Sequence, residues 1–452
     1  MARRPRTPNT GLAALLLQAR WGNDQLARAV NRVGGEQGLG LTYDKSSVSH
    51  WLSGARPRAE VREVVREAFA RRLGRPVTPE ETGFGDPVQQ GGGAPGGSTL
   101  SDLMSIGKAD VDPSRRGVLS AGLYSVALAL PGFDDPDAAD RVTRTGAGRT
   151  VRIGPGEVET VRAMTGRIAG ILDELGAAHA RPMAAAFLVN SVGPWLRASG
   201  SEQVKADLLA AAADLTYLTG WMAMYETAHG LGQQYYVQAL KLAREARDHV
   251  TYCRTLRGMA LQASNLGYGP RALELADSAA EAAPAAGPRL RAFLAGQQAH
   301  GAAMVKDRRQ AFARLAETEA ALARADGRND AVGGYDQAAY HFHVAHVLYE
   351  LGDLAGSVQE LQISNRVRPA NEKQGRVHAN GLLARRQTEL GHVEAACATW
   401  HAFLDDYVTL SSVRGDEHFR ALGTSLAARA GSPGVVRRLR QRTDEVARQK
   451  TA

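Results

Sequence analysis

The stretch 44–57, with the sequence DKSSVSHWLSGARP, holds the residue types best suited to recognising a partner. Asp44 can cap a helix, and Val48, Trp51 and Leu52 follow at helical spacing as one apolar stripe. The glycine and proline of SGARP would end that helix. Its opposite face carries donors and acceptors and no carboxylate, which suits base edges in the major groove of DNA. The alternative interpretation is a solvated face on an ordinary helix.

The distribution of charge favours the DNA interpretation. Residues 1–75 contain 14 Lys and Arg against 6 Asp and Glu, a net charge of +8. The remaining residues contain 41 of each sign, because the whole chain has 55 basic and 47 acidic residues. Positive charge confined to a small domain is typical of a nucleic-acid binder.

Three further helices are expected around this stretch, at about 9–21, 23–33 and 59–73, with a glycine-rich turn over 34–40. Together they predict a DNA-binding domain over 1–85. A basic arm that contains Arg3, Arg4 and Arg6 precedes them and could neutralise phosphates. The other candidate DNA-contacting residues are Lys45, Ser46, Ser47, Ser49, His50, Ser53, Arg56 and Arg58.

The segments QLARAV and SSVSHWLSGARP together resemble the Cro/repressor-type (XRE) helix-turn-helix family, in which the third helix reads DNA. The resemblance covers about 65 residues and implies that double-stranded DNA is the partner. Gln25 matches the start of the second helix, and Lys45, Ser46, Ser49 and His50 match groove-facing positions. This sequence departs from the family pattern in two ways, and both bear on the angle at which the third helix would dock on DNA. The turn before the third helix is longer than is usual, and position 52 holds leucine where an acidic residue is common.

The rest of the chain predicts an all-α protein. Helix formers dominate, and alternating β-branched runs are nearly absent. Cys253 and Cys397 stand far apart, which fits a reducing cytoplasm, and no apolar run is long enough to span a membrane. Residues 86–113, which include GGGAPGGS, predict a flexible linker.

Segment 114–156 is expected to hold a short docking helix and an irregular stretch. SRRGVL followed by AGLYSVALALPG looks like a twin-arginine export signal, but it lies more than one hundred residues into the chain. We therefore interpret 116–130 as a short apolar helix that docks on the C-terminal body or on a second subunit.

Residues 157–447 contain apolar helical patterns in pairs, repeated about every 36–42 residues. The pattern resembles the tetratricopeptide repeat class and implies an α-solenoid of helical hairpins, because no single pair can bury its apolar face. Glycine turns are expected at 230, 267, 352 and 391, and small residues at 239, 272, 311 and 395. The predicted pairs are 205–226 with 232–248, 250–266 with 270–283, 288–305 with 307–325, 335–351 with 354–367, and 372–390 with 392–407, followed by a cap at 416–430 and 435–446.

A solenoid presents a concave groove that can bind a peptide, a protein or a small-molecule effector. The candidate groove residues are polar and aromatic residues of the first helices: Trp221, Tyr225, Tyr252, Asn265, Gln298, Tyr340, His343 and Asn380. The alternative is that most of these aromatic residues merely pack between repeats.

Catalytic motifs are not found, and we expect no enzyme activity and no cofactor. The cluster HFHVAH, with His341, His343 and His346, lacks the cysteine or carboxylate that would complete a tetrahedral metal site nearby. No phosphate-binding loop, nucleophile elbow or HExxH motif occurs.

The combination of a Cro-like domain, a linker and a helical-repeat body resembles actinobacterial transcriptional regulators of the NsdA-like kind. The resemblance implies a cytoplasmic regulator, often a repressor of differentiation or secondary-metabolite genes. We expect a homodimer that places two reading helices in successive major grooves. The alternative is a protein-interaction scaffold with only weak, non-specific DNA binding.

Overall fold

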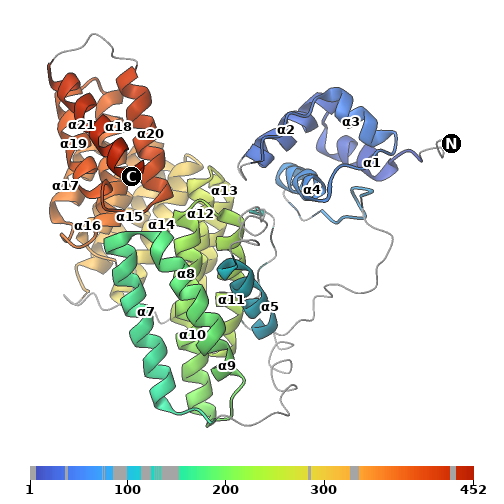
Figure 1. The fold of residues 1–452 in the computed structure, drawn as a ribbon, viewed down its shortest axis with the longest axis horizontal. Coiled ribbons are helices and arrows are strands. Elements are labelled where there is room, and N and C mark those ends of the chain that lie inside the picture. The colour runs from blue at the N-terminus through green and yellow to red at the C-terminus, as the bar shows by residue number, and fades with distance from the viewer. Residues whose placement is uncertain are drawn as a thin grey trace.

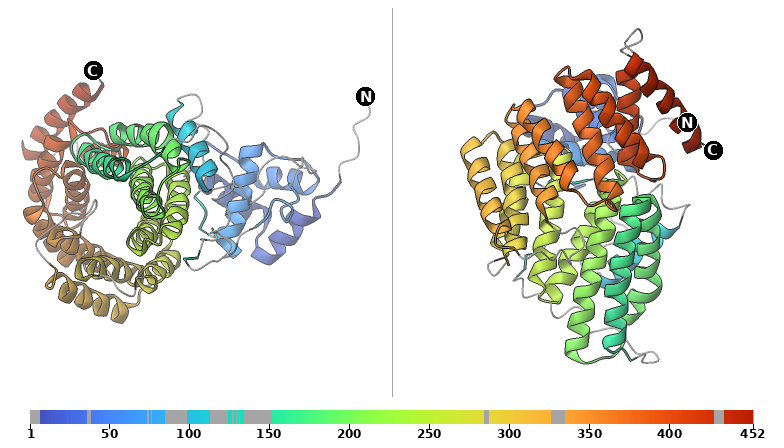
Figure 2. Two further views of the ribbon diagram at one scale, coloured as in Figure 1. Left: turned by 90° about the horizontal axis from the view of Figure 1, so that it is seen from below. Right: turned by 90° about the vertical axis from the view of Figure 1, so that its left-hand side faces the viewer.

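The computed structural model describes residues 7–35, 39–73, 75, 77–84, 99–112, 124–126, 128, 130, 132–133, 152–283, 287–325, 335–427 and 434–451. Nearly all of these residues lie in helices or in the short turns between them (Figure 1). The predicted all-α fold class is confirmed. Figure 2 shows two bodies: a small N-terminal group of helices beside a large ring of helices.

The N-terminal domain contains helices α1 to α4, which pack around a core of their own. The apolar residues predicted to face inward do so, and Val48, Val64 and Phe69 are fully buried. The backbone N–H of Asn9, the residue before α1, donates to the carbonyl of Leu52 at 2.8 Å and so connects the start of α1 to the end of α3. The helix bounds are α1 Thr10–Ala19, α2 Asn23–Gly35, α3 Lys45–Leu52 and α4 Ala59–Leu73.

The predicted linker is wrong at its C-terminal end, because α5 (Thr99–Val111) occupies that part. The helix packs against the repeat body and places Asp110 in its interior. Asp110 accepts hydrogen bonds from Arg181 and from the hydroxyl of Tyr235, and Arg181 also pairs with Glu226. A buried ion pair of this kind anchors α5 firmly, because removal of one partner would leave a charge in the interior.

The predicted docking helix over 116–130 is also wrong where the chain can be described. The described residues between 124 and 133, here called the strap, are turn or irregular rather than helical. They do dock on the body, as predicted. The amide of Ser125 and its carbonyl both bond to the side chain of Gln233, and the carbonyl of Leu128 accepts from Arg271.

The repeat body begins with α7 and continues as antiparallel helix pairs to the end of the described chain. All five predicted pairs and the terminal pair are present, with ends displaced by a few residues. The helices are α7 Pro155–Leu175, α8 Ala177–Phe187, the π-turn η2 Leu188–Val192, α9 Gly193–Leu196, α10 Glu202–Tyr225, α11 His229–Glu245, α12 His249–Asn265, α13 Gly269–Glu281, α14 Pro288–Met304, α15 Arg308–Leu322, α16 Gln337–Glu350, α17 Leu354–Val367, α18 Lys373–Glu389, α19 Val393–Tyr407, α20 Val413–Ala427 and α21 Gly434–Thr451.

A recurring turn connects the helices of the body and explains part of the glycine pattern. In the described part of the body, Gly176 after α7 and one residue at each of six later junctions have positive φ. Glycine fills this position at 267, 352 and 391, as predicted, whereas Thr227, Arg247 and Lys306 adopt it at the other three. The prediction for Gly230 is wrong, because that residue lies inside α11. Of the predicted small contact residues, those at 239, 272 and 311 are buried, but Ala395 is exposed and Ala396 is buried instead.

The solenoid closes on itself, which the sequence did not predict. Figure 2 shows the first helices of the body beside the last ones, with the inner helices surrounding a centre. At this seam α7 packs on α18, and the amide of Ser411 donates to the carbonyl of Leu175 at 2.8 Å. Gly176 has φ +97° and lies against the backbone of Ser411, where a Cβ atom would collide. The predicted open groove is therefore the interior of a ring.

Candidate DNA interface and central cavity

The proposed reading helix α3 is capped as its sequence indicates. Asp44 accepts from the backbone N–H and from the hydroxyl of Ser47, both at 2.8 Å, and these bonds lower the pKa of Asp44. Ser53 donates its hydroxyl to the carbonyl of His50 at 2.8 Å. The hydroxyls of Ser47 and Ser53 are therefore already engaged with their own helix.

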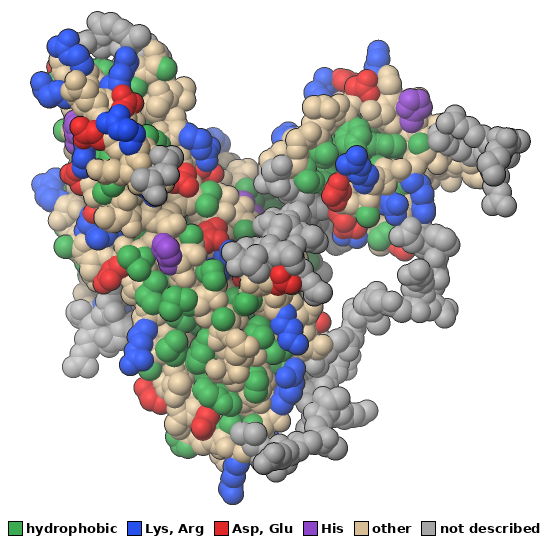
Figure 3. Space-filling model, viewed as in Figure 1, with side chains coloured by type: hydrophobic (Ala, Val, Ile, Leu, Met, Phe, Trp, Pro, Cys, Tyr) green, Lys and Arg blue, Asp and Glu red, His purple; other side chains and the backbone are tan. Residues whose placement is uncertain are grey.

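The polar face of α3 is open to solvent, and the apolar stripe is buried. Val48 has no exposed surface and Trp51 has 4 %, while Leu52 is half-buried. Figure 3 shows Lys and Arg side chains around the visible edge of this domain. The exposed candidates are Lys45, Ser46, Ser49, His50, Ser53, Arg56 and Arg58; Ser47 is half-buried, and Arg3, Arg4 and Arg6 lie outside the described residues.

A hollow separates the start of α2 from α3. It is lined by backbone and polar side chains, which include Gln25 and Arg28 from α2 and Lys45 and Ser49 from α3. Asp24 lines it too and pairs with Arg28 at 2.5 Å. The N–H groups at the start of a helix favour an anion, so these groups and Lys45 are the ones suited to a DNA phosphate. Gln25 is held in place because its side-chain oxygen accepts from the amide of Gly22 at 2.7 Å.

Helix α4 fastens the N-terminal domain to the ring through the strap. The side chain of Arg71 on this helix is buried and pairs with Glu67 at 2.8 Å. Glu67 also accepts from the amide of Val126, and Arg71 donates to the carbonyl of Tyr124. The guanidinium of Arg71 further lies 4.9 Å from the ring centre of Tyr268, the residue that precedes α13 in the turn after α12. Burial raises the pKa of Glu67 despite its bonds with Arg71.

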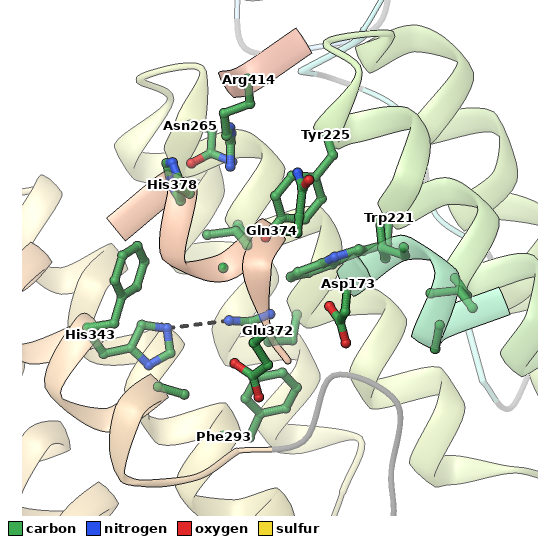
Figure 4. Close-up of a pocket in the computed structure, with 18 of the residues that line it drawn as sticks. Asp173, Trp221, Tyr225, Asn265, Phe293, His343, Glu372, Gln374, His378 and Arg414 are labelled. Carbon is green, nitrogen blue, oxygen red and sulfur yellow. Dashed lines mark hydrogen bonds between the residues drawn. The ribbon is translucent and has the colours of Figure 1, made fainter. Parts of the chain in front are cut away.

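The centre of the ring encloses a cavity of about 340 Å³, which is lined by the inner helices. Four of the eight predicted groove residues line it: Trp221, Tyr225, Asn265 and His343. Figure 4 shows these side chains directed toward one space from different helices. Side chains that the prediction missed complete the wall, chiefly Arg257, Phe293, His378, Arg414, Asp173 and Glu372.

The other four predicted groove residues lie elsewhere. Tyr252 is buried under the strap, with its ring 5.0 Å from that of Phe133. The amide of Gln298 donates to Asp277, and Asn380 accepts from Asn365. Tyr340 packs beside Phe293 and Tyr335 without lining the cavity. Each of these four side chains contacts neighbouring segments and lies outside the cavity wall.

A sequence signal for the missed residues exists in the repeat period. Trp221, Arg257 and Phe293 are each separated by 36 residues, and all three line the cavity. After the longer connection to His343, the next lining residues His378 and Arg414 follow at 35 and 36. One register position of each first helix therefore faces inward. A choice by residue type alone overlooked Arg257, Phe293 and Arg414.

Arg257 is the most unusual group in this cavity. Its side chain is 5 % exposed, yet its Nε and Nη1 atoms have no hydrogen-bond partner. The guanidinium carbon lies 4.0 Å from the ring centre of Phe293 and 5.6 Å from that of Trp221, and Nη2 approaches His343 Nε2 at 3.4 Å. Burial lowers the pKa of Arg257, and an arginine remains charged under these conditions nonetheless.

The histidines around the cavity are kept neutral. Burial, supported by nearby guanidinium groups, lowers the pKa of His300 to about 4 and that of His343 well below its ordinary value. His346 and His378 shift in the same direction for the same reason. Neutral imidazoles leave the arginines as the cationic groups of this wall.

Two acidic residues near the seam also line the cavity. Burial, together with the neighbouring carboxylate of Glu372, raises the pKa of Asp173 to about 7. Glu372 itself pairs with Arg368 at 2.9 Å. Figure 4 shows Asp173 beside Trp221 and Glu372 nearer to Phe293.

The histidine cluster of α16 divides between different neighbours. His341 contacts Glu360 at 2.6 Å, His343 contacts the hydroxyl of Tyr335 at 2.9 Å, and His346 packs against His300. Within the described residues no group of three or more His, Cys, Asp or Glu side chains has the geometry to hold a metal ion. Likewise, none of the described helices combines the length and apolar character that crossing a membrane requires.

Comparisons with known proteins include a family match over the N-terminal part. The family model described as the SP15 N-terminal domain matches residues 12–85. A solved structure of a Rap protein complexed with competence and sporulation factor is similar in part, with a TM-score of 0.38 and 14 % identity, over 64 % of this chain and 88 % of that chain. No curated protein matches the sequence. The resemblance to the Cro/XRE and NsdA-like regulators stays a prediction.

Proposed function

We propose that this protein is a non-catalytic, cytoplasmic transcriptional regulator that reads double-stranded DNA with α3 and responds to an effector in the ring. The observation that carries the proposal is the solvent-exposed, carboxylate-free face of α3 in the part of the chain that holds the whole net positive charge. Ser46, Ser49 and His50 would meet base edges, and Lys45 and Arg56 would contact phosphates. Repression of differentiation or secondary-metabolite genes is the role that the family resemblance implies.

The hollow between α2 and α3 supports this assignment. It offers helix-terminal N–H groups beside Arg28 and Lys45, so that a phosphate bound there would place α3 against the adjacent groove. Two such domains in a homodimer paired through the helical bodies would contact half-sites about 34 Å apart.

The contacts of α12 support control by an effector. The same helix carries Arg257 into the cavity and ends beside Tyr268, whose ring stacks on Tyr124 of the strap at 5.9 Å. The strap in turn bonds to Glu67 and Arg71 of α4. An effector that binds one arrangement of α12 more tightly than another would shift the position of the DNA-binding domain by that difference in affinity.

The test is equilibrium DNA binding by the full chain on genomic fragments across a range of salt concentrations. A preferred fragment should bind at least about 10³-fold more tightly than random DNA, and a Ser49→Ala/His50→Ala double variant should lose that preference. Lys45→Ala should weaken all DNA alike and reduce the salt slope by about one phosphate contact. The matched control is Arg437→Ala/Arg438→Ala, which removes two exposed cations from α21 and should leave the preference intact.

A protein-interaction scaffold is the second candidate, and the surface of the body favours it. Figure 3 shows hydrophobic side chains gathered over α7 to α10, where Leu175 and Met183 are 46 % and 45 % exposed. Exposed apolar surface of this kind often marks a protein contact. Weak DNA binding without a preferred fragment, unchanged in the double variant, would favour the scaffold over the regulator.

A further inference from the structure

We propose that the central cavity binds a small anionic molecule, with a carboxylate or phosphate on Arg257 and a flat apolar part against the rings of Trp221 and Tyr225. The inference rests on the proposed function for its biological role, because it names the chemical class of the effector. The binding chemistry itself is independent of DNA.

The first argument is the unmet hydrogen-bonding capacity of Arg257. Nε and Nη1 are buried donors without a partner, and within the described residues no carboxylate pairs with this side chain. Buried donors almost always find a partner, so a cation left in this state points to a group that binds there. A carboxylate or a phosphate matches the planar fork of a guanidinium with two parallel bonds.

Other buried polar atoms of the wall lack partners as well. They are Nδ1 of His300, Oε1 of Gln374 and Nε of Arg368, and all three residues line the same cavity. Together with Nε and Nη1 of Arg257 they give the wall several buried polar atoms that a polar ligand could pair with.

The walls around Arg257 determine what else the ligand must contain. The rings of Trp221 and Phe293 flank the guanidinium, and Tyr225 lies beyond Trp221 with ring centres 5.6 Å apart. Flat surfaces of this kind favour an aromatic or otherwise planar body. A volume of about 340 Å³ matches one small molecule.

A second arginine lines the cavity. Arg414 lies with its guanidinium carbon 5.2 Å from the ring centre of Tyr225. Of the two acidic residues in the wall, Glu372 is already paired with Arg368, and burial together with the Glu372 carboxylate raises the pKa of Asp173 to about 7. Within the described residues neither carboxylate forms an ion pair with Arg257, so its unpaired donors stay available to an anion.

Arg254, on the same helix, is a buried arginine with a structural partner. It is 7 % exposed, close to the value for Arg257, but it pairs with Asp214 at 2.8 Å and does not line the cavity. Because the two residues are one turn apart on α12, Arg254 is a matched control for burial and charge.

The experiment measures calorimetric binding of three probes to the full chain: indole-3-acetate, phenyl phosphate and the neutral indole-3-acetamide. At least one anionic probe should bind, and Arg257→Gln should weaken it by about ten-fold or more, as expected for a charge-assisted pair. The same variant should change affinity for the amide by less than about two-fold. Binding of only the carboxylate or only the phosphate identifies which anion the site takes.

Melting temperatures of the ligand-free variants separate a binding role from a structural one. Arg257→Met should melt at or above the wild-type temperature, because it removes an unsatisfied buried charge, whereas Arg254→Met should melt lower. The proposal is overturned if neither anion binds at 10 mM, if Arg257→Gln retains full affinity, or if Arg257→Met melts as low as Arg254→Met. None of these assays contains DNA, so failure of the regulator function would leave their outcome unchanged.

Discussion

Acidification from pH 7.5 to 5.5 should destabilise the repeat body through its buried histidines. Burial lowers the pKa of His229 and His300 to about 4 and that of His418 to about 3, against about 6.5 in an unfolded chain. A depressed histidine pKa contributes stability that is present above pH 6.5 and is lost as pH falls, because only the unfolded state gains protons there.

The size of the effect follows from these shifts. Between pH 7.5 and 5.5 each of the three histidines should cost about 1.4 kcal/mol, or about 4 kcal/mol together. Asp173 acts in the opposite direction. Because its pKa is raised to about 7, the folded state gains a proton over this range and the unfolded state does not, which adds about 2 kcal/mol to the free energy of unfolding. The net loss is therefore about 2 kcal/mol, and His343, His346 and His378 increase it, since their pKa values are lowered as well. Such a loss is a large fraction of a typical folding free energy of roughly 5–15 kcal/mol.

The assay is urea unfolding followed by far-UV circular dichroism at pH 7.5, 6.5 and 5.5. The urea concentration at the unfolding midpoint should fall at each step to lower pH, while the dependence of the unfolding free energy on urea stays constant. His300→Gln should reduce the loss by about 1.4 kcal/mol, whereas His392→Gln, at an exposed position before α19, should not change it. An unchanged midpoint at pH 5.5, or equal behaviour of the two variants, would refute the reasoning.

Three further changes test the packing that positions the site. Trp51→Ala should destabilise the N-terminal domain by about 3–5 kcal/mol and abolish sequence-specific DNA binding, while the helicity of the ring is kept; retained specific binding would contradict the role of α3. Asp44→Ala should cost about 1 kcal/mol through loss of the cap on α3, measured as the shift of the domain's unfolding midpoint, with Asp24→Ala on α2 as a comparison. Thr227→Gly should stabilise the body by about 1 kcal/mol in thermal unfolding, because a β-branched residue at φ 58° is strained, and a lower melting temperature would contradict this.

The sequence alone was enough for the features that depend on local pattern. The apolar stripe of Val48 and Trp51 predicted the buried face of α3, because helical periodicity is written in neighbouring residues. The helix pairs and the left-handed turns at Gly267, Gly352 and Gly391 were predictable for the same reason. The concentration of basic residues in the first 75 positions likewise needed no coordinates.

Only the tertiary structure decided what faces the cavity and what lies on the outside. Tyr252 and Trp221 are both aromatic residues of first helices, but one packs under the strap and the other lines the cavity, because the rotation of each helix is fixed by its neighbours. Closure of the ring at Gly176 and Ser411 depends on the summed small rotations of every repeat, which no local segment encodes. The repeat period marks Arg257 as a cavity-facing position, but its burial without a partner is a property of contacts between distant segments, which no local pattern encodes.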